Sequence, residues 1–139
     1  MRTKWYNIIF LMAVLAIYSC DKESMPGQAT PGQAFELELG ESAFFNKGDF
    51  KIFFSQMLGD NRCPTSIECM RAGEAKVKVL VQKSGKVVTS FELGTKPVES
   101  IANAVAFEDF NIQLKDVRPY PTSNKPIPTE EYAIQLQID

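Results

Sequence analysis

Apolar residues recur at every second position through most of the chain after residue 33. The first such run covers residues 35–39, and the second covers residues 50–58. The same alternation appears in residues 75–81, 87–93, 110–114 and 132–138. A period of two places successive side chains on opposite faces of a strand, so each run predicts a short strand with one buried face.

The connections between these runs favour an antiparallel, all-β fold. Gly, Pro, Asn and Ser separate the runs, and Ser84-Gly85 suits a two-residue hairpin turn. Residues 100–107 fit either a helical turn or a strand, and the proline-rich residues 119–130 are expected to form one long loop. We predict a small antiparallel β-sandwich or barrel of about seven to eight strands, formed by residues 34–139.

The N-terminus is typical of an export signal. Arg2 and Lys4 precede an apolar run at residues 8–18, which is too short to span a bilayer, and Ser19 stands directly before Cys20. Residues 1–19 are therefore predicted to be a lipoprotein signal peptide. The segment that ends at Cys20 resembles the lipobox of bacterial lipoproteins, which implies that Cys20 carries the lipid and anchors the protein to the outer membrane. The alternative is an ordinary secreted protein in which Cys20 has no such role.

Residues 20–33 are predicted to be the lipid anchor and a flexible linker. Residues 21–24 (DKES) resemble the charged tetrapeptide that follows the lipidated cysteine in surface-exported lipoproteins of Bacteroidetes-type Gram-negative bacteria. This resemblance favours display on the cell surface over a periplasm-facing orientation. Residues 25–33 contain two Pro-Gly pairs and no apolar periodicity, which predicts a spacer.

Composition argues against several classes of function. The chain has no His, which removes Ser-His-Asp and Cys-His catalysis and His-ligated zinc. Without Arg2 and Lys4 the basic residues number 15 − 2 = 13 against 17 acidic ones, a net charge of −4, which argues against a nucleic-acid partner. No metal or other cofactor is expected. Paired carboxylates such as Glu108-Asp109 and Glu130-Glu131 could not converge on one bond if they were adjacent on a strand.

The segment between the runs at 50–58 and 75–81 holds the remaining cysteines, Cys63 and Cys69. An exported protein meets an oxidising compartment, so we predict a structural disulfide between them, worth roughly 2 kcal/mol. A redox role is less favoured because five intervening residues do not match the Cys-x-x-Cys spacing, and two cysteines without His are too few for zinc.

Charged residues crowd the same segment and allow two interpretations. Asp60, Arg62, Glu68 and Arg71 could form a recognition loop in which an arginine engages a carboxylate or a sugar of a partner. Alternatively, Arg62 pairs with a neighbouring acid or binds backbone carbonyls and holds the loop in shape, which is the interpretation we favour. Asp60 and Asn61 could also offer oxygens to Ca²⁺, but a turn accounts for them equally well.

The cysteine motif carries a resemblance to a family. The stretch 60–64 (DNRCP), followed by Cys69, Ala72 and Gly73, resembles a signature Asp-Ser-Arg-Cys-Pro, Cys, Trp-Ala-Gly of uncharacterised bacterial lipoproteins and secreted domains. Residues 114–119 and 132–136 also resemble that family, which implies no settled activity. This chain has Asn61 in place of Ser and Arg71 in place of Trp, so no role that needs an aromatic ring at that position can be carried over.

The sequence thus predicts an exported, lipid-anchored and non-enzymatic binding module at the cell envelope. Its partners would be the membrane, through the N-terminal lipid, and an unknown protein or glycan. An alternative is a lipid-anchored inhibitor of a protease or lysozyme, since a rigid disulfide-bonded loop suits insertion into an active site. A carboxylate-dependent glycan hydrolase is less favoured.

Overall fold

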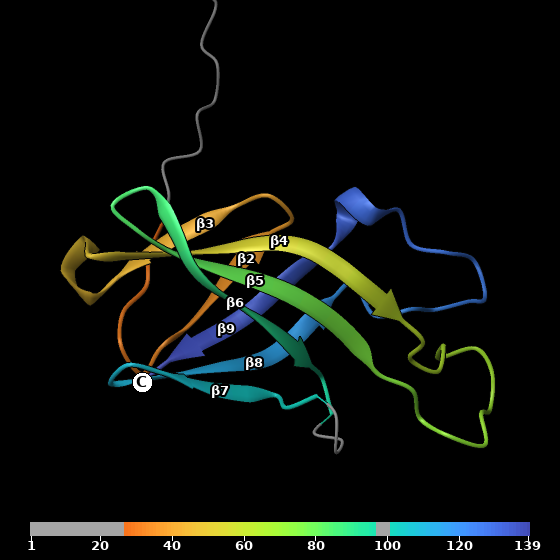
Figure 1. Cartoon of the computed structure of the whole chain (residues 1–139). Helices are drawn as coiled ribbons and strands as arrows, with labels where there is room; N and C mark the ends of the chain where they lie inside the picture. The colour runs from red at the N-terminus through yellow and green to blue at the C-terminus, as the bar shows by residue number, and fades with distance from the viewer. Residues whose placement is uncertain (1–26, 97–100) are drawn as a thin grey trace, which may run out of the picture.

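Two β-sheets pack face to face in the computed structural model, which describes residues 27–96 and 101–139 (Figure 1). One sheet has the strand order β1-β3-β4-β5-β6 and the other the order β2-β9-β8-β7. Every strand pair is antiparallel except β1 with β3. The strands are β1 (Gly27–Gln28), β2 (Ala34–Glu38), β3 (Ser42–Phe45), β4 (Phe50–Asp60), β5 (Ala75–Lys83), β6 (Lys86–Gly94), β7 (Ala104–Phe107), β8 (Phe110–Arg118) and β9 (Ala133–Ile138), with short 3-10 turns η2 (Asn46–Gly48) and η3 (Thr129–Glu131).

The alternation read from the sequence places one side of each sheet in the core. Along β5 every second side chain is fully buried, and the intervening residues are partly exposed. Phenylalanines close one end of the sandwich, where Phe45 and Phe50 from one sheet meet Phe110 from the other at centroid distances of 5.3–6.5 Å. Edge-to-face contacts of this kind add to the stabilisation from burial. The two sheets are therefore joined by one continuous apolar layer.

The predicted all-β class is confirmed, and the two separate sheets correspond to the sandwich. The ambiguous segment contains strand β7, and Ser84 and Gly85 form the expected tight turn with φ values of 50° and 76°. The sequence did not predict β1 or β3. Residues 119–130 form the long connection between β8 and β9 and include most of η3.

Residues 27–33 differ from the predicted spacer because they belong to the folded domain. Gly27 and Gln28 pair with β3. Ala29 is buried and its N–H donates to the Phe44 carbonyl at 2.8 Å, while the Gly32 N–H donates to the Ile138 carbonyl at 2.8 Å. These backbone hydrogen bonds and the burial of the Ala29 side chain hold residues 27–33 against the domain, although their sequence predicts a flexible linker.

The remaining N-terminal predictions lie outside the described residues. These are the signal peptide at residues 1–19, the lipidation of Cys20, the charged residues 21–24 and the first part of the spacer. Across residues 27–96 and 101–139, none of the helical segments has the length and apolar character needed to cross a bilayer.

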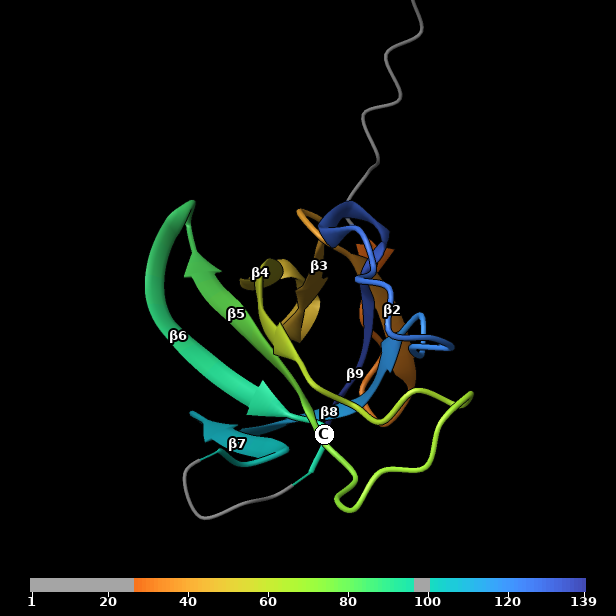
Figure 2. The ribbon, with the colours of Figure 1, turned by 90° about the vertical axis from the view of Figure 1, so that its right-hand side faces the viewer.

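Two long connections meet at one end of the sandwich (Figures 1 and 2). The cysteine loop (residues 61–74) joins β4 to β5, and the proline loop (residues 119–128) follows β8. We call this end, with both loops, the loop end. The Arg118–Pro119 peptide at the start of the proline loop is cis. The Ser84-Gly85 turn and the β7–β8 turn lie at the opposite end, because β4, β5, β8 and β9 each run the full length of their sheets.

Candidate functional site

Cys63 and Cys69 form the predicted disulfide within the cysteine loop. Their Cα atoms are 5.9 Å apart, and the bond closes a ring over a sequence separation of 6. Cys63 is half-buried and Cys69 is exposed. The bridge removes conformational freedom from a segment that has no regular secondary structure of its own.

The base of the loop is held by a buried ion pair between Arg62 and Asp60. The arginine is 6% exposed, and its Nε and Nη2 donate to the two carboxylate oxygens of Asp60 at 2.8 and 2.6 Å. The Arg62 backbone N–H adds a third hydrogen bond to Asp60 Oδ1 at 3.2 Å. A fork-to-fork pair fixes both the position and the orientation of the guanidinium.

The same guanidinium joins the cysteine loop to the other sheet. Nη1 donates to the Val117 carbonyl at 2.5 Å, and Nη2 donates to the Pro119 carbonyl at 2.8 Å. A backbone hydrogen bond of 3.1 Å from Thr65 N–H to the Pro121 carbonyl also joins the cysteine loop to the proline loop. Arg62 therefore lies at the centre of a junction between residues more than 50 positions apart in sequence.

Tyr132 completes the junction from the start of β9. Its hydroxyl donates to Asp60 Oδ2 at 3.0 Å. Burial raises the pKa of Tyr132, and the hydrogen bond to Asp60 and the charge of that carboxylate raise it further, to about 12. Burial also acts to raise the pKa of Asp60, but hydrogen bonds from Arg62 and Tyr132 and the arginine charge outweigh it, so the pKa is lowered. At neutral pH Asp60 is thus an anion and Tyr132 a neutral donor.

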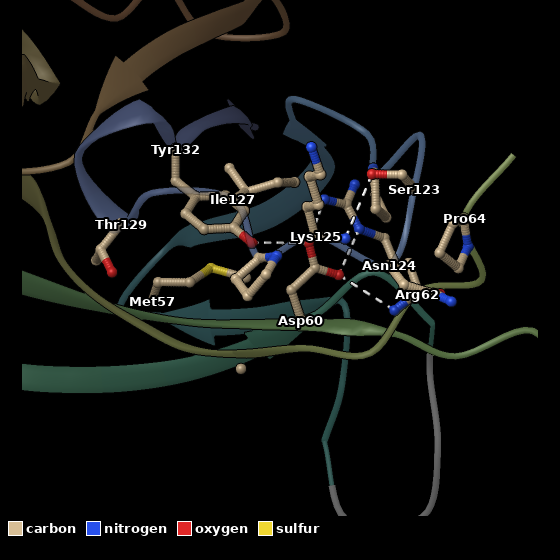
Figure 3. A pocket seen from close by; sticks show the side chains of 13 residues that line it. Met57, Asp60, Arg62, Pro64, Ser123, Asn124, Lys125, Ile127, Thr129 and Tyr132 are labelled. Atoms are coloured by element: carbon tan, nitrogen blue, oxygen red, sulfur yellow. Dashed lines mark hydrogen bonds and ion pairs between the residues drawn. The ribbon is translucent and has the colours of Figure 1, made fainter. Parts of the chain in front are cut away.

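A pocket of about 490 Å³ opens beside this junction (Figure 3). The apolar side chains of Met57 and Ile127 line it together with prolines from both loops. Neutral polar side chains and one lysine come from the proline loop and η3: Ser123, Asn124, Lys125 and Thr129. Both oxygens of Asp60 already accept hydrogen bonds from Arg62 and Tyr132, so the carboxylate stabilises the wall of the pocket. The lining suits contact and hydrogen bonding with a ligand.

The C-terminal side of the cysteine loop is held by a second set of contacts. Asn61 and Glu74 exchange two hydrogen bonds, from Asn61 N–H to the Glu74 carbonyl at 3.0 Å and from Glu74 N–H to Asn61 Oδ1 at 2.6 Å. Gly73 lies against Asn61 so closely that a Cβ atom would be 1.7 Å from the Asn61 carbonyl oxygen. Lys96 Nζ donates to the Ala72 carbonyl at 3.0 Å.

The structure separates the four residues predicted as a recognition loop. Asp60 and Arg62 turn inward, so they do not form an exposed recognition surface, and the interpretation that Arg62 holds the loop is confirmed. The physical reason is that the pair satisfies its charges internally with 8% or less of either side chain exposed. Glu68 and Arg71 lie on the exposed part of the loop.

The carboxylate pairs considered in the sequence lie at opposite ends of the fold. Glu108 and Asp109 form the exposed turn between β7 and β8, whereas Glu130 and Glu131 lie in η3 beside the start of β9. Within the part of the chain that the structure describes, no cluster of three or more His, Cys, Asp or Glu side chains is placed to hold a metal ion.

Sequence reasoning missed two tyrosines at the loop end. Tyr132 was taken only as a strand residue, although it bonds Asp60, which is 72 positions away. Tyr120 is 48% exposed, and its ring covers the Arg62 guanidinium at 4.9 Å from the ring centroid. Neither contact has a local pattern in the sequence that could reveal it.

Comparison with known proteins adds no relative to this description. No family model, curated protein or solved structure matches the chain.

Proposed function

We propose that the protein is a lipid-anchored, non-enzymatic binding module of the bacterial envelope, which engages its partner through the loop end. Its export and its lipid on Cys20 are part of the proposal and rest on the N-terminal sequence. The proposed membership of the lipoprotein family rests on the resemblance of the cysteine motif and of residues 114–119 and 132–136.

The observation that carries the proposal is the junction at Arg62. One buried side chain bonds Asp60, Val117 and Pro119 and so fixes the cysteine loop against the proline loop. Together with the disulfide, it gives two irregular loops a defined relative position. Preorganised loops lose little conformational entropy when a partner binds, so this construction suits recognition.

Exposed apolar side chains at the loop end support the same function. Ile67, Met70 and Tyr120 are 43%, 105% and 48% exposed. Ile67 and Met70 belong to the cysteine loop, and Tyr120 belongs to the proline loop. Apolar and aromatic groups on a rigid support are typical of the residues that contribute most to a protein interface.

The position of the loops also suits a protein anchored by its N-terminus. The first described strand, β1, pairs with Ala43 and Phe44 of β3. These two residues in turn pair with Ile52 and Lys51, near the beginning of β4. The cysteine loop leaves the far end of β4, after Asp60. The binding surface is thus remote from the point at which the chain joins the domain.

Site-specific photocrosslinking in living cells tests the proposal. A photoreactive phenylalanine analogue replaces Glu68 in the cysteine loop or, as a matched control, Lys86, an exposed charged residue at the opposite end. We expect a discrete crosslinked species from position 68 and none from position 86. Absence of a species specific to position 68 would overturn the assignment of the loop end as the binding surface.

A further inference from the structure

We infer that Met70 is the side chain with which the cysteine loop occupies the active site of a serine endopeptidase whose primary pocket accepts an apolar residue. This inference rests on the proposed function and names its partner class. Under it, the protein inhibits that endopeptidase.

Met70 has the exposure that an inserted side chain needs. At 105% relative exposure it projects fully into solvent, more than any other large apolar residue described. Methionine is unbranched and flexible, so it can adapt to an apolar pocket on a partner. A side chain of this type has no stabilising contact to lose from the free protein when it becomes buried in a complex.

The backbone is held on both sides of Met70. Cys69 directly precedes it and is bonded to Cys63. Ala72, two residues after it, receives the hydrogen bond from Lys96, and Gly73 and Glu74 pack against Asn61. Only Met70 and Arg71 lie between these fixed points, so binding orders a very short length of chain.

The backbone groups around Met70 are free to bind a peptide-recognising cleft. Among the described residues, the N–H and carbonyl groups of Cys69, Met70 and Arg71 make no hydrogen bond within the protein. Endopeptidase clefts can engage such a segment by strand-like backbone pairing, with side-chain pockets supplying specificity. The cysteine loop extends outward from the sandwich, which suits a concave partner (Figure 2).

The same contacts would slow net cleavage of the segment by the endopeptidase. Hydrolysis of the Met70–Arg71 bond would add one water molecule, leaving a carboxylate on Met70 and an amine on Arg71. The disulfide would retain the first new end, and the contacts of Ala72, Gly73 and Glu74 would retain the second. Ends held in proximity favour re-formation of the bond and slow the release of products.

Inhibition assays with the purified full-length protein test the inference. The probes are chymotrypsin, whose primary pocket is an apolar slot, and trypsin, whose pocket carries an aspartate. We expect the wild-type protein to inhibit chymotrypsin and Met70→Asp to weaken that inhibition by about 100-fold or more. Met70→Lys should transfer inhibition to trypsin. Val87→Asp, a change at a 54% exposed apolar residue at the other end of the fold, should leave inhibition unchanged.

Three results would overturn the inference. The first is absence of chymotrypsin inhibition by the wild-type protein, and the second is inhibition that survives Met70→Asp. The third is rapid, complete cleavage at Met70–Arg71. The urea unfolding midpoints of the Met70 variants are measured as well, and unchanged midpoints exclude misfolding as the reason for a change in inhibition. If any of these results occurs while position 68 still gives a crosslink, the inhibitor inference fails but the proposed binding module stands. If position 68 gives no crosslink, both proposals fail.

Discussion

Asp60 and Arg62, two positions apart in sequence, form a bidentate ion pair in which the arginine side chain is 4% and the aspartate side chain 8% exposed. Replacing Arg62 by Met should leave the Asp60 charge buried without its partner and remove the hydrogen bonds that the Val117 and Pro119 carbonyls accept from the guanidinium. Removing one member of a buried pair typically costs about 3–5 kcal/mol, so we expect a drop of roughly 3 kcal/mol in the free energy of unfolding, measured with urea.

Arg118 provides the matched control for this change. It forms ion pairs with Glu36 and Asp116 at 3.4 and 3.2 Å, but its side chain is 57% exposed. Exposed pairs contribute little, so Arg118→Met should change the free energy of unfolding by less than about 1 kcal/mol. Similar effects of the two substitutions would contradict the role assigned to Arg62.

The junction should make stability depend on pH in two separate windows. The pKa of Asp60 lies below its ordinary value of 3.8 in the folded protein, so its contribution is full above pH 3.8 and is lost as the pH falls through the lowered value. The pKa of Tyr132 is raised from 10.0 to about 12, so its contribution is full below pH 10.0 and is lost as the pH rises through 12.

Urea unfolding as a function of pH measures both windows. Asp60→Asn should reduce the acid-side decline, and Tyr132→Phe should reduce the alkaline decline without abolishing the acid one. If Tyr132→Phe leaves the alkaline profile of the wild-type protein unchanged, the hydroxyl does not stabilise the fold in the way described.

Gly73 should tolerate no side chain. The Cβ of Gly73→Ala would overlap the backbone carbonyl of Asn61, and backbone cannot move aside as a flexible side chain does. We expect a loss of at least about 2 kcal/mol in unfolding free energy, together with increased proteolysis within the cysteine loop. Gly59→Ala is the control, because nothing lies within 4 Å of a Cβ built there, and it should cost less than about 1 kcal/mol.

Cys20 should determine where the protein resides. Cys20→Ala removes the sulfur atom to which we propose that lipid is attached, so we expect the protein to leave the membrane fraction or to remain unprocessed. Fractionation followed by mass spectrometry of the N-terminal peptide measures both outcomes. A fully processed variant that stays with the membrane would show that lipid on Cys20 is not the anchor.

The strands were predictable where one face is buried and the other is polar. In β5 the valines alternate with Lys76, Lys78 and Gln82, and the period of two stays visible although Leu80 breaks the polar face. In β3 the adjacent residues Phe44 and Phe45 are both apolar, one beneath Lys51 and the other in the core, and the alternation disappears. Strand β1 is too short to carry any period.

The site was predictable only where its contacts are local. The export signal and the presence of one remaining cysteine pair predicted the Cys63–Cys69 disulfide, and the closeness of Asp60 to Arg62 suggested an ion pair. The direction in which Arg62 points depends on Val117 and Pro119, whose carbonyls leave no trace in the sequence. The exposure of Met70 likewise depends on contacts distant in sequence, such as the hydrogen bond from Lys96 to Ala72.

The folding of residues 27–33 into the domain shortens the tether that the proposed lipid on Cys20 would provide. Between Cys20 and Gly27 there are 27 − 20 = 7 Cα–Cα steps. A fully extended chain covers at most about 3.6 Å per residue, so Gly27 can stand no more than about 25 Å from Cys20, the proposed site of the lipid. That reach is similar to the thickness of the hydrocarbon core of a bilayer. Partners that bind the loop end would therefore be captured close to the membrane surface rather than far out in the surrounding medium.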